Sequence, residues 1–237
     1  MNRMLKAFLA VTVGGGGGCG SASTPAAVGA HDPHHAHGAG PSHHHQHGFA
    51  DAGAWATVFD DPARDAWQHP DDVLRAMDLT PAMTVADVGA GTGYFAVRLA
   101  RAVPEGKVIA TDIEPDMVRY LNERAGREHL TNLRALPATH AASGLAAQSV
   151  DRIVIVHVWH HLADRVAYAR DLSAALRPNG RLFIVDFSLT AQRGPPPNLR
   201  MAAETIIAEL AAAGWTARVS PVALGPDQYI VEARKER

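Results

Sequence analysis

The 237-residue sequence contains a single cysteine, Cys19. One cysteine cannot form a disulfide within the chain, so cysteine usage gives no sign of an oxidising compartment. Positive charge is not in excess: 22 Lys and Arg stand against 24 Asp and Glu, for a formal net charge of −2. Because no basic stripe with interleaved aromatic residues is present, we expect no nucleic-acid partner. The apolar stretch at 7–13 is too short to span a bilayer as a stable anchor.

Residues 1–20 are typical of a bacterial export signal. A short basic start, the apolar stretch at 7–13 and a run of glycines precede Cys19, where lipoprotein processing would modify a new N-terminal cysteine. Gly16 stands where a leucine is usual in such signals. We expect a location in the cell envelope, periplasmic or lipid-anchored, with membrane contact only through this anchor. The alternative is a cytoplasmic protein with a disordered apolar tail.

Residues 21–48 have the composition of a disordered linker. Proline, glycine and alanine separate eight histidines, and no apolar face is available for burial. Clustered imidazoles can bind zinc, nickel or copper in flexible geometry, so weak metal capture is one interpretation and a solvated tether is the other. The remaining sequence offers no companion set of Cys and His ligands, so we predict no specific metal site.

The turn that follows residues 85–88 carries the strongest signal of the sequence. An apolar strand pattern runs into Gly89, Gly91 and Gly93, and a helical pattern starts at once. Glycines permit backbone angles that side chains exclude, and they let a ligand lie against the main chain. Free N–H groups at the start of the helix would face that ligand. The dinucleotide fingerprint needs a third glycine where Tyr94 stands, which argues against a nicotinamide dehydrogenase.

A second strand pattern, at 107–112, ends in Asp112, about twenty residues after the glycines, where a ribose-binding carboxylate is expected. A carboxylate that accepts from both ribose hydroxyls makes charge-assisted hydrogen bonds. The alternative is that Asp112 only caps the helix that starts at Pro115. A third strand is predicted at 133–136.

Two later segments complete an ordered series. Residues 149–162 give a strand followed by His160-His161, and residues 176–187 give Leu-Arg-Pro-Asn-Gly-Arg-Leu and another strand. With the glycine turn and Asp112, these segments resemble the class I S-adenosylmethionine (SAM)-dependent methyltransferases of small molecules, including the quinone C-methyltransferase group. The resemblance covers roughly residues 49–237. It implies SAM as cosubstrate, an unidentified small-molecule methyl acceptor, and a three-layer Rossmann-like α/β fold whose seven-stranded sheet has the order 3-2-1-4-5-7-6, with helices on both faces.

The resemblance also implies roles for individual residues. The cofactor-binding set comprises Asp87, Gly89, Gly91, Gly93, Tyr94, Asp112 at the ribose, Ile113 beside the adenine, Thr139 near the adenine amino group, and His157 near the methyl position. The catalytic candidates are His157, His160 and Asp186. Relatives often carry a carboxylate or a small polar residue where His157 stands, so its catalytic role does not follow from the resemblance. A neutral imidazole there could take a proton from the acceptor. Structural alternatives remain: one histidine of the pair bonds across the sheet, and Asp186 is a cap or a structural partner.

The two ends of the domain complete the prediction. Residues 49–80 are expected to form a helical lid, with Arg64, Trp67 and Gln68 facing the ligands or, alternatively, packing on the surface. A helix at 199–213 and strands at 215–219 and 228–233 should end the fold. The alternative function is a non-catalytic SAM-fold binding protein whose histidine-rich segment handles metal.

Overall fold

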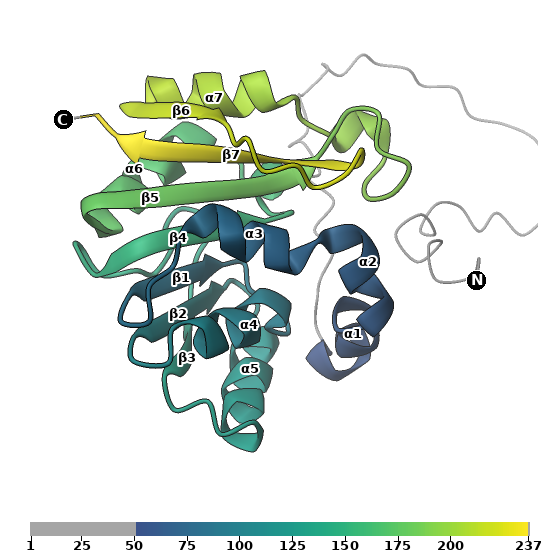
Figure 1. Ribbon diagram of the computed structural model, residues 1–237, viewed down its shortest axis with the longest axis vertical. Coiled ribbons are helices and arrows are strands. Elements are labelled where there is room, and N and C mark those ends of the chain that lie inside the picture. Colours follow the sequence, from purple (N-terminus) through teal and green to yellow (C-terminus); the bar gives the residue numbers. More distant parts are fainter. Residues whose placement is uncertain (1–50, 237) are drawn as a thin grey trace, which may run out of the picture. The chain divides into compact units, whose positions relative to one another are not determined.

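The computed structural model describes residues 51–236. The predicted export signal (residues 1–20) and linker (residues 21–48) lie outside the described residues. The described chain forms a seven-stranded sheet in the order β3-β2-β1-β4-β5-β7-β6 (Figure 1), which confirms the predicted topology. The strands are β1 (Thr84–Val88), β2 (Lys107–Asp112), β3 (Leu133–Pro137), β4 (Val150–Val156), β5 (Leu176–Phe187), β6 (Trp215–Val219) and β7 (Gln228–Lys235).

Strand direction brings the candidate residues to one edge of the sheet. The strands from β3 to β5 pair in parallel, whereas β7 pairs antiparallel with both β5 and β6. Parallel strands are covered on both faces and have nearly continuous apolar sequences, and all five residues of β1 are buried. In open sheets of this kind ligands bind beyond the carboxyl ends of the strands.

Helices cover both faces of the sheet and give the expected three layers. The helical segments are α1 (Ala52–Phe59), η2 (Pro62–Arg64), α2 (Asp65–Gln68), α3 (Pro70–Met77), α4 (Tyr94–Ala102), α5 (Pro115–Arg127), η3 (Trp159–His161), α6 (Arg165–Ala175), η4 (Pro197–Leu199) and α7 (Ala203–Ala212). One face of the sheet packs against α3, α4 and α5 through residues such as Met77 and Leu99. The other face packs against α6 and α7 through residues such as Leu172 and Ile206.

The predicted lid consists of α1, η2, α2 and α3, from residue 51 onward. In Figure 1, α1 and α2 lie beside the carboxyl edge of the parallel strands. Two contacts join α1 to α5. The Ala52 N–H donates to Asp116 at 2.7 Å, and Asp60, just after α1, forms an ion pair with Arg124 at 2.9 Å.

The predicted helix at 199–213 needs correction, because α7 begins only at Ala203. Ala202 is extended, with φ of −73° and ψ of 146°. The preceding Met201 carbonyl accepts a hydrogen bond from the Tyr229 hydroxyl at 2.8 Å, so this carbonyl is bound to the sheet instead of starting a helix. Gly214, with φ of +83°, follows the helix as predicted.

The predicted Pro-Asn-Gly turn before the fifth strand lies within β5 itself. Val150 of β4 pairs with Leu176, but Arg152, two residues later, pairs with Arg181. The extra residues of β5 form a bulge in which Asn179 takes a φ of +65°, a conformation that asparagine tolerates better than most residues. Between residues 51 and 236, no helix is long and apolar enough to cross a membrane.

Candidate active site

The turn between β1 and α4 holds the three predicted glycines in the left-handed region. Gly89, Gly91 and Gly93 have φ of +74°, +55° and +96°, which glycine adopts without a steric penalty. The N–H groups of Gly89 and Ala90 donate to the Thr111 carbonyl at 2.7 and 3.0 Å, and that of Gly91 donates to a β2 carboxylate. These three N–H groups are therefore bound within the protein, and a ligand here would lie on glycine Cα atoms. The expectation that free N–H groups at the start of α4 face a ligand stays a prediction.

The three glycines meet different neighbours. A Cβ at Gly89 would collide with the Val158 side chain, and a Cβ at Gly93 would collide with Leu121. Packing within the protein is therefore enough to require glycine at both positions. A Cβ at Gly91 would meet the Phe59 ring at an ordinary contact distance of 3.5 Å. Phe59 of α1 thus covers the middle of the turn.

Asp87 places a carboxylate beneath this turn. The residue is 3% exposed, and its Oδ2 has no hydrogen-bond partner among the described residues. Burial, followed by the nearby charge of Asp112, raises the pKa of Asp87 to about 7, against the opposing effect of Arg64. Because a buried charge needs a partner, an open carboxylate oxygen at this place suits a cationic group such as an ammonium.

Asp112 ends β2 and binds the turn directly. Its Oδ2 accepts from the Gly91 N–H at 2.8 Å, and its Oδ1 accepts from the Glu114 N–H at 3.0 Å. A carboxylate has about four acceptor positions, so these bonds leave acceptor capacity for ligand hydroxyls. Burial raises the pKa of Asp112, and the backbone hydrogen bonds oppose that shift. A role limited to capping α5 would explain the bond from Glu114 but not the bond from Gly91.

Two further predicted contacts lie on exposed positions. Ile113, directly after Asp112, is a large apolar residue that is 45% exposed, so it is available to a flat apolar ring. Thr139 is exposed too, but its hydroxyl accepts hydrogen bonds from the N–H groups of Ala141 and Ala142 at 3.3 and 3.0 Å. Thr139 therefore stabilises the loop after β3, and its predicted contact with adenine stays a prediction.

Tyr94 fastens the N-terminal segment to α4. The Cζ atoms of Arg64 and Arg98 each lie 4.0 Å from its ring centroid. Its hydroxyl donates to Asp65, which also accepts from Arg98 at 2.7 Å. Cation–π contacts strengthen when they are shielded from water, and Tyr94 is buried. Tyr94, which stands where the dinucleotide fingerprint has its third glycine, therefore connects α2 to α4.

Arg64 starts a chain of hydrogen bonds that runs from the N-terminal segment toward the ends of β4 and β5. Its guanidinium donates to Gln68 Oε1 at 2.9 and 3.1 Å and to the Phe59 carbonyl at 2.9 Å. Gln68 in turn donates to Gln228 Oε1 at 2.6 Å. Burial lowers the pKa of Arg64 to about 10, which leaves the guanidinium charged at neutral pH. Both Arg64 and Gln68 therefore face inward and not toward solvent.

His157 lies in a cluster of rings at the end of β4. It has a φ of +57° and stacks on Phe187 with centroids 4.0 Å apart; Trp67 lies nearly parallel to both rings at 6.1 and 6.2 Å. The Gln228 amide nitrogen donates to the Trp67 carbonyl at 2.6 Å, so its Oε1 accepts from His157 Nε2 at 2.9 Å. Neutral His157 therefore carries its proton on Nε2. Burial lowers the pKa of His157 to about 3.

His160 and Asp186 form a buried pair across the sheet. His160 Nδ1 lies 3.1 Å from both carboxylate oxygens, and the two side chains are 4% and 0% exposed. Asp186 also accepts from the Phe187 N–H at 2.8 Å. This geometry agrees with the structural alternative, and the catalytic roles of His160 and Asp186 stay predictions. Within the described range, no group of three or more His, Cys, Asp or Glu residues could hold a metal ion; the histidine-rich segment is outside that range.

Comparison with known proteins assigns this arrangement to a family. Residues 85–180 match a family described as a methyltransferase domain. A solved SAM-dependent methyltransferase from Aquifex aeolicus is 30% identical, covers 77% of this chain and 97% of its own, and superposes with a TM-score of 0.71. The chain belongs to the class I SAM-dependent methyltransferase family.

Curated relatives are similar to part of this chain. The ubiquinone/menaquinone biosynthesis C-methyltransferase of Syntrophotalea carbinolica is 29% identical over 48% of this chain and 48% of that protein. Acetylserotonin O-methyltransferase of Rattus norvegicus is 30% identical over 62% of this chain and 34% of that protein. The chain therefore spans half or less of the length of these curated relatives.

The residues at the glycine turn fit SAM, which carries a sulfonium, an ammonium and a carboxylate. The site offers a buried carboxylate, Asp87, a half-buried carboxylate, Asp112, and a half-buried guanidinium, Arg64. The unpartnered oxygen of Asp87 suits the ammonium, and the remaining acceptor positions of Asp112 suit ribose hydroxyls. The exposed Ile113 suits the adenine ring.

Sequence reasoning missed Phe187 and Gln228 as site residues. Because β7 is antiparallel, its first residue lies at the carboxyl edge of its neighbour, and Gln228 pairs with Phe187. The predicted antiparallel end of the sheet contained this signal, since any residue that starts β7 must lie near the ligand edge. The ion pair between Asp60 and Arg124 had no comparable signal in the sequence.

Proposed function

We propose that this chain transfers the methyl group of SAM to a small-molecule acceptor bound between α2 and the carboxyl ends of β4 and β5. The bound cosubstrate supplies an electrophilic methyl group on a sulfonium. The protein then has to align the acceptor with that methyl group and exclude water. The observation that carries the proposal is the buried Asp87 carboxylate beside the glycine turn, whose Oδ2 has no hydrogen-bond partner among the described residues, in a chain 30% identical to a SAM-dependent methyltransferase.

We assign the acceptor to planar aromatic or quinoid molecules. Trp67, His157 and Phe187 form a set of nearly parallel rings at the end of β4. Phe187 is buried, whereas Trp67 and His157 are partly exposed, and partly exposed rings favour offset stacking with another ring. Two similar proteins are named for the methylation of acetylserotonin and for ubiquinone/menaquinone biosynthesis, which supports an acceptor that contains a ring.

His157 forms part of the acceptor wall in this proposal. A general base works best when its pKa lies near the working pH, and the pKa of His157 is about 3. This value argues against the predicted role of His157 as the base. Its Nε2 proton is already donated to Gln228, which fixes the orientation of the ring against Phe187.

Calorimetry with SAM, followed by mass spectrometry of methylated products from a panel of phenols and quinols, tests the proposal. Trp67→Ala should raise the KM for the acceptor about tenfold or more and leave the Kd for SAM within about twofold, because the lost ring face contributes on the order of 1–2 kcal/mol. Trp55→Ala, on α1 of the same segment, is the matched control and should keep the acceptor KM. Failure to bind SAM would refute the whole proposal, whereas SAM binding without methylation of any aromatic acceptor would refute only the acceptor class.

A further inference from the structure

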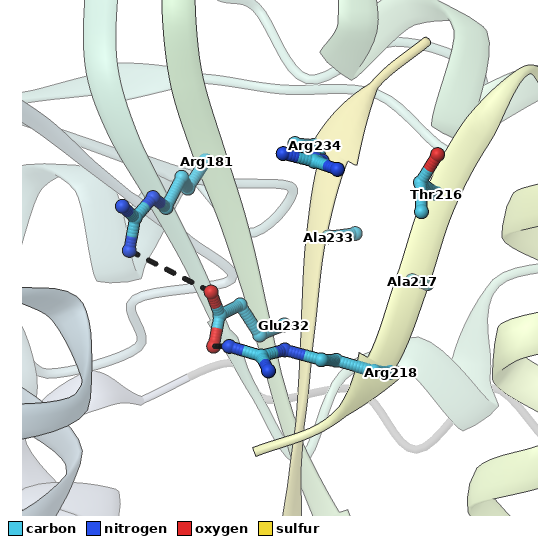
Figure 2. Close-up of a pocket in the computed structure, with 7 residues that line it drawn as sticks. All are labelled: Arg181, Thr216, Ala217, Arg218, Glu232, Ala233 and Arg234. Carbon is cyan, nitrogen blue, oxygen red and sulfur yellow. Dashed lines mark hydrogen bonds and ion pairs between the residues drawn. The ribbon is translucent and has the colours of Figure 1, made fainter.

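A second, positively charged site lies on the sheet face formed by β5, β7 and β6. A groove of about 370 Å³ is lined there by Arg181, Thr216, Ala217, Arg218, Glu232, Ala233 and Arg234 (Figure 2). Arg181 precedes the end of β5 by six residues, which corresponds to about 20 Å along a strand. The groove is therefore separate from the methyltransferase site.

Strand register places three arginines in one row across this face. Arg152 of β4 pairs with Arg181 of β5, Arg181 pairs with Arg234 of β7, and Arg234 pairs with Thr216 of β6. Residues paired in this way project from the same face of a sheet, and like charges placed opposite each other are destabilising. The pKa of Arg152 is lowered by burial and, next in size, by the charge of Arg181. A chain with a net charge of −2 thus concentrates positive charge at this place.

One carboxylate partly neutralises the residues that line the groove. Glu232 lies 3.6 Å from Arg181 and 3.4 Å from Arg218, which approach it from opposite sides (Figure 2). The Arg234 side chain is exposed and, within residues 51–236, has no hydrogen-bond or ion-pair partner. The groove is therefore lined by three guanidiniums, those of Arg181, Arg218 and Arg234, and by one carboxylate, that of Glu232, which leaves a local net charge of +2.

We propose that this groove binds the dianionic phosphate monoester group of a small polar molecule. A phosphate monoester carries two negative charges above its second pKa, near 6, which matches the local charge. Guanidiniums bind phosphate oxygens through forked, charge-assisted hydrogen bonds. No aromatic side chain lines the groove, so recognition depends on charge and hydrogen bonding and not on stacking of a base. The volume lies within the range of small-molecule sites.

Calorimetric titration of the full chain at pH 8, where methyl phosphate is a dianion, with methyl phosphate and dimethyl phosphate tests this proposal. The second probe has a closely related shape but a single negative charge. Methyl phosphate should bind with 1:1 stoichiometry and at least tenfold more tightly than dimethyl phosphate. Arg234→Gln should weaken methyl phosphate binding about tenfold. The matched control is Arg134→Gln, which removes an exposed arginine of β3 with the same change of net charge, and it should bind like the unmodified chain.

Equal affinity for the two esters, or equal binding by the two variants, would overturn the proposal. Vesicles that contain phosphatidylglycerol, a phosphodiester lipid, provide a further arm. Binding to these vesicles without binding of methyl phosphate would assign the face to a membrane surface and would also overturn the proposal. SAM affinity should stay unchanged in both variants, so failure at this groove and failure of the methyltransferase proposal are distinguishable.

Discussion

The buried carboxyl of Asp87 predicts a specific pH dependence of SAM binding. Burial raises the pKa of Asp87 to about 7, so the group is largely protonated and neutral below that pH. An ammonium group beside Asp87 would favour the ionised form. Binding of SAM should therefore release this proton, and the affinity should fall as the pH drops below 7.

Proton linkage gives the size of this effect. A group with a pKa of about 7 is about 90% protonated at pH 6 and about 25% protonated at pH 7.5. Affinity for SAM should therefore be about eightfold weaker at pH 6 than at pH 7.5, or about 1.3 kcal/mol. The α-amino group of the ligand titrates near pH 8, above this range. The raised pKa of Asp87 also affects folding. The free energy of unfolding of the cofactor-free protein should decrease as the pH rises from about 4 to about 7, because in this range the unfolded chain has already lost the proton that the folded protein keeps.

Calorimetry at pH 6 in two buffers with different ionisation enthalpies counts the protons released. We expect about 0.9 proton per bound SAM, and no release by Asp87→Asn, whose weaker binding should not depend on pH in this range. Asp112→Asn keeps Asp87 but removes a charge that raises its pKa, so the midpoint should move to lower pH. Absence of proton release, or a pH dependence that persists in Asp87→Asn, would refute the placement of Asp87 at the ammonium.

Three further predictions concern the glycine turn and the hydrogen bonds around it. Asp112→Ala should weaken SAM binding by about 1.5–3 kcal/mol, the scale of a hydrogen bond to a charged group; unchanged affinity in calorimetry would remove the ribose assignment. Gly93→Ala combines a φ of +96° with a collision against a leucine of α5, so it should lower the free energy of unfolding by about 1–3 kcal/mol in urea titrations. Gly126→Ala is the control, because Gly126 has open space in α5, and it should raise that free energy by about 0.5–1 kcal/mol. Equal effects of the two substitutions would contradict the packing argument. Gln228→Ala leaves the His157 Nε2 proton without its acceptor and should cost about 1–3 kcal/mol of stability; an unchanged urea midpoint would show that this bond contributes little.

The strands and the glycine turn were predictable because their signals are local in sequence. Hydrophobic alternation and turn residues placed the strand at 215–219 at its observed limits and the third strand within one residue of its end. Asp112 was predictable because a strand that ends in an acid about twenty residues after such a turn is itself a short-range pattern. The start of α7 was not predictable in this way, since a hydroxyl of β7 binds the Met201 carbonyl from 28 residues away.

The closed arrangement of the N-terminal segment depends on contacts that no local pattern contains. The Gln68 side chain reaches Gln228 across 160 residues of sequence, and the covering position of Phe59 over Gly91 depends on how α1 packs on α5. Periodicity indicated helices in this segment, and the family resemblance indicated a lid. Neither could indicate which side chains meet, because that is decided by the packing of the completed sheet.

The segment from Phe59 to Trp67 lies beside both proposed ligand positions, that of the cosubstrate and that of the acceptor. Phe59 lies over the glycine turn, and Trp67 lies beside the rings of His157 and Phe187. The Arg64 guanidinium bonds to the Phe59 carbonyl and also to Gln68, next to Trp67. A ligand that displaces Phe59 from the turn must therefore disturb the hydrogen bonds that position Trp67. Because a change shared by two sites couples their affinities reciprocally, cosubstrate and acceptor should not bind this protein independently.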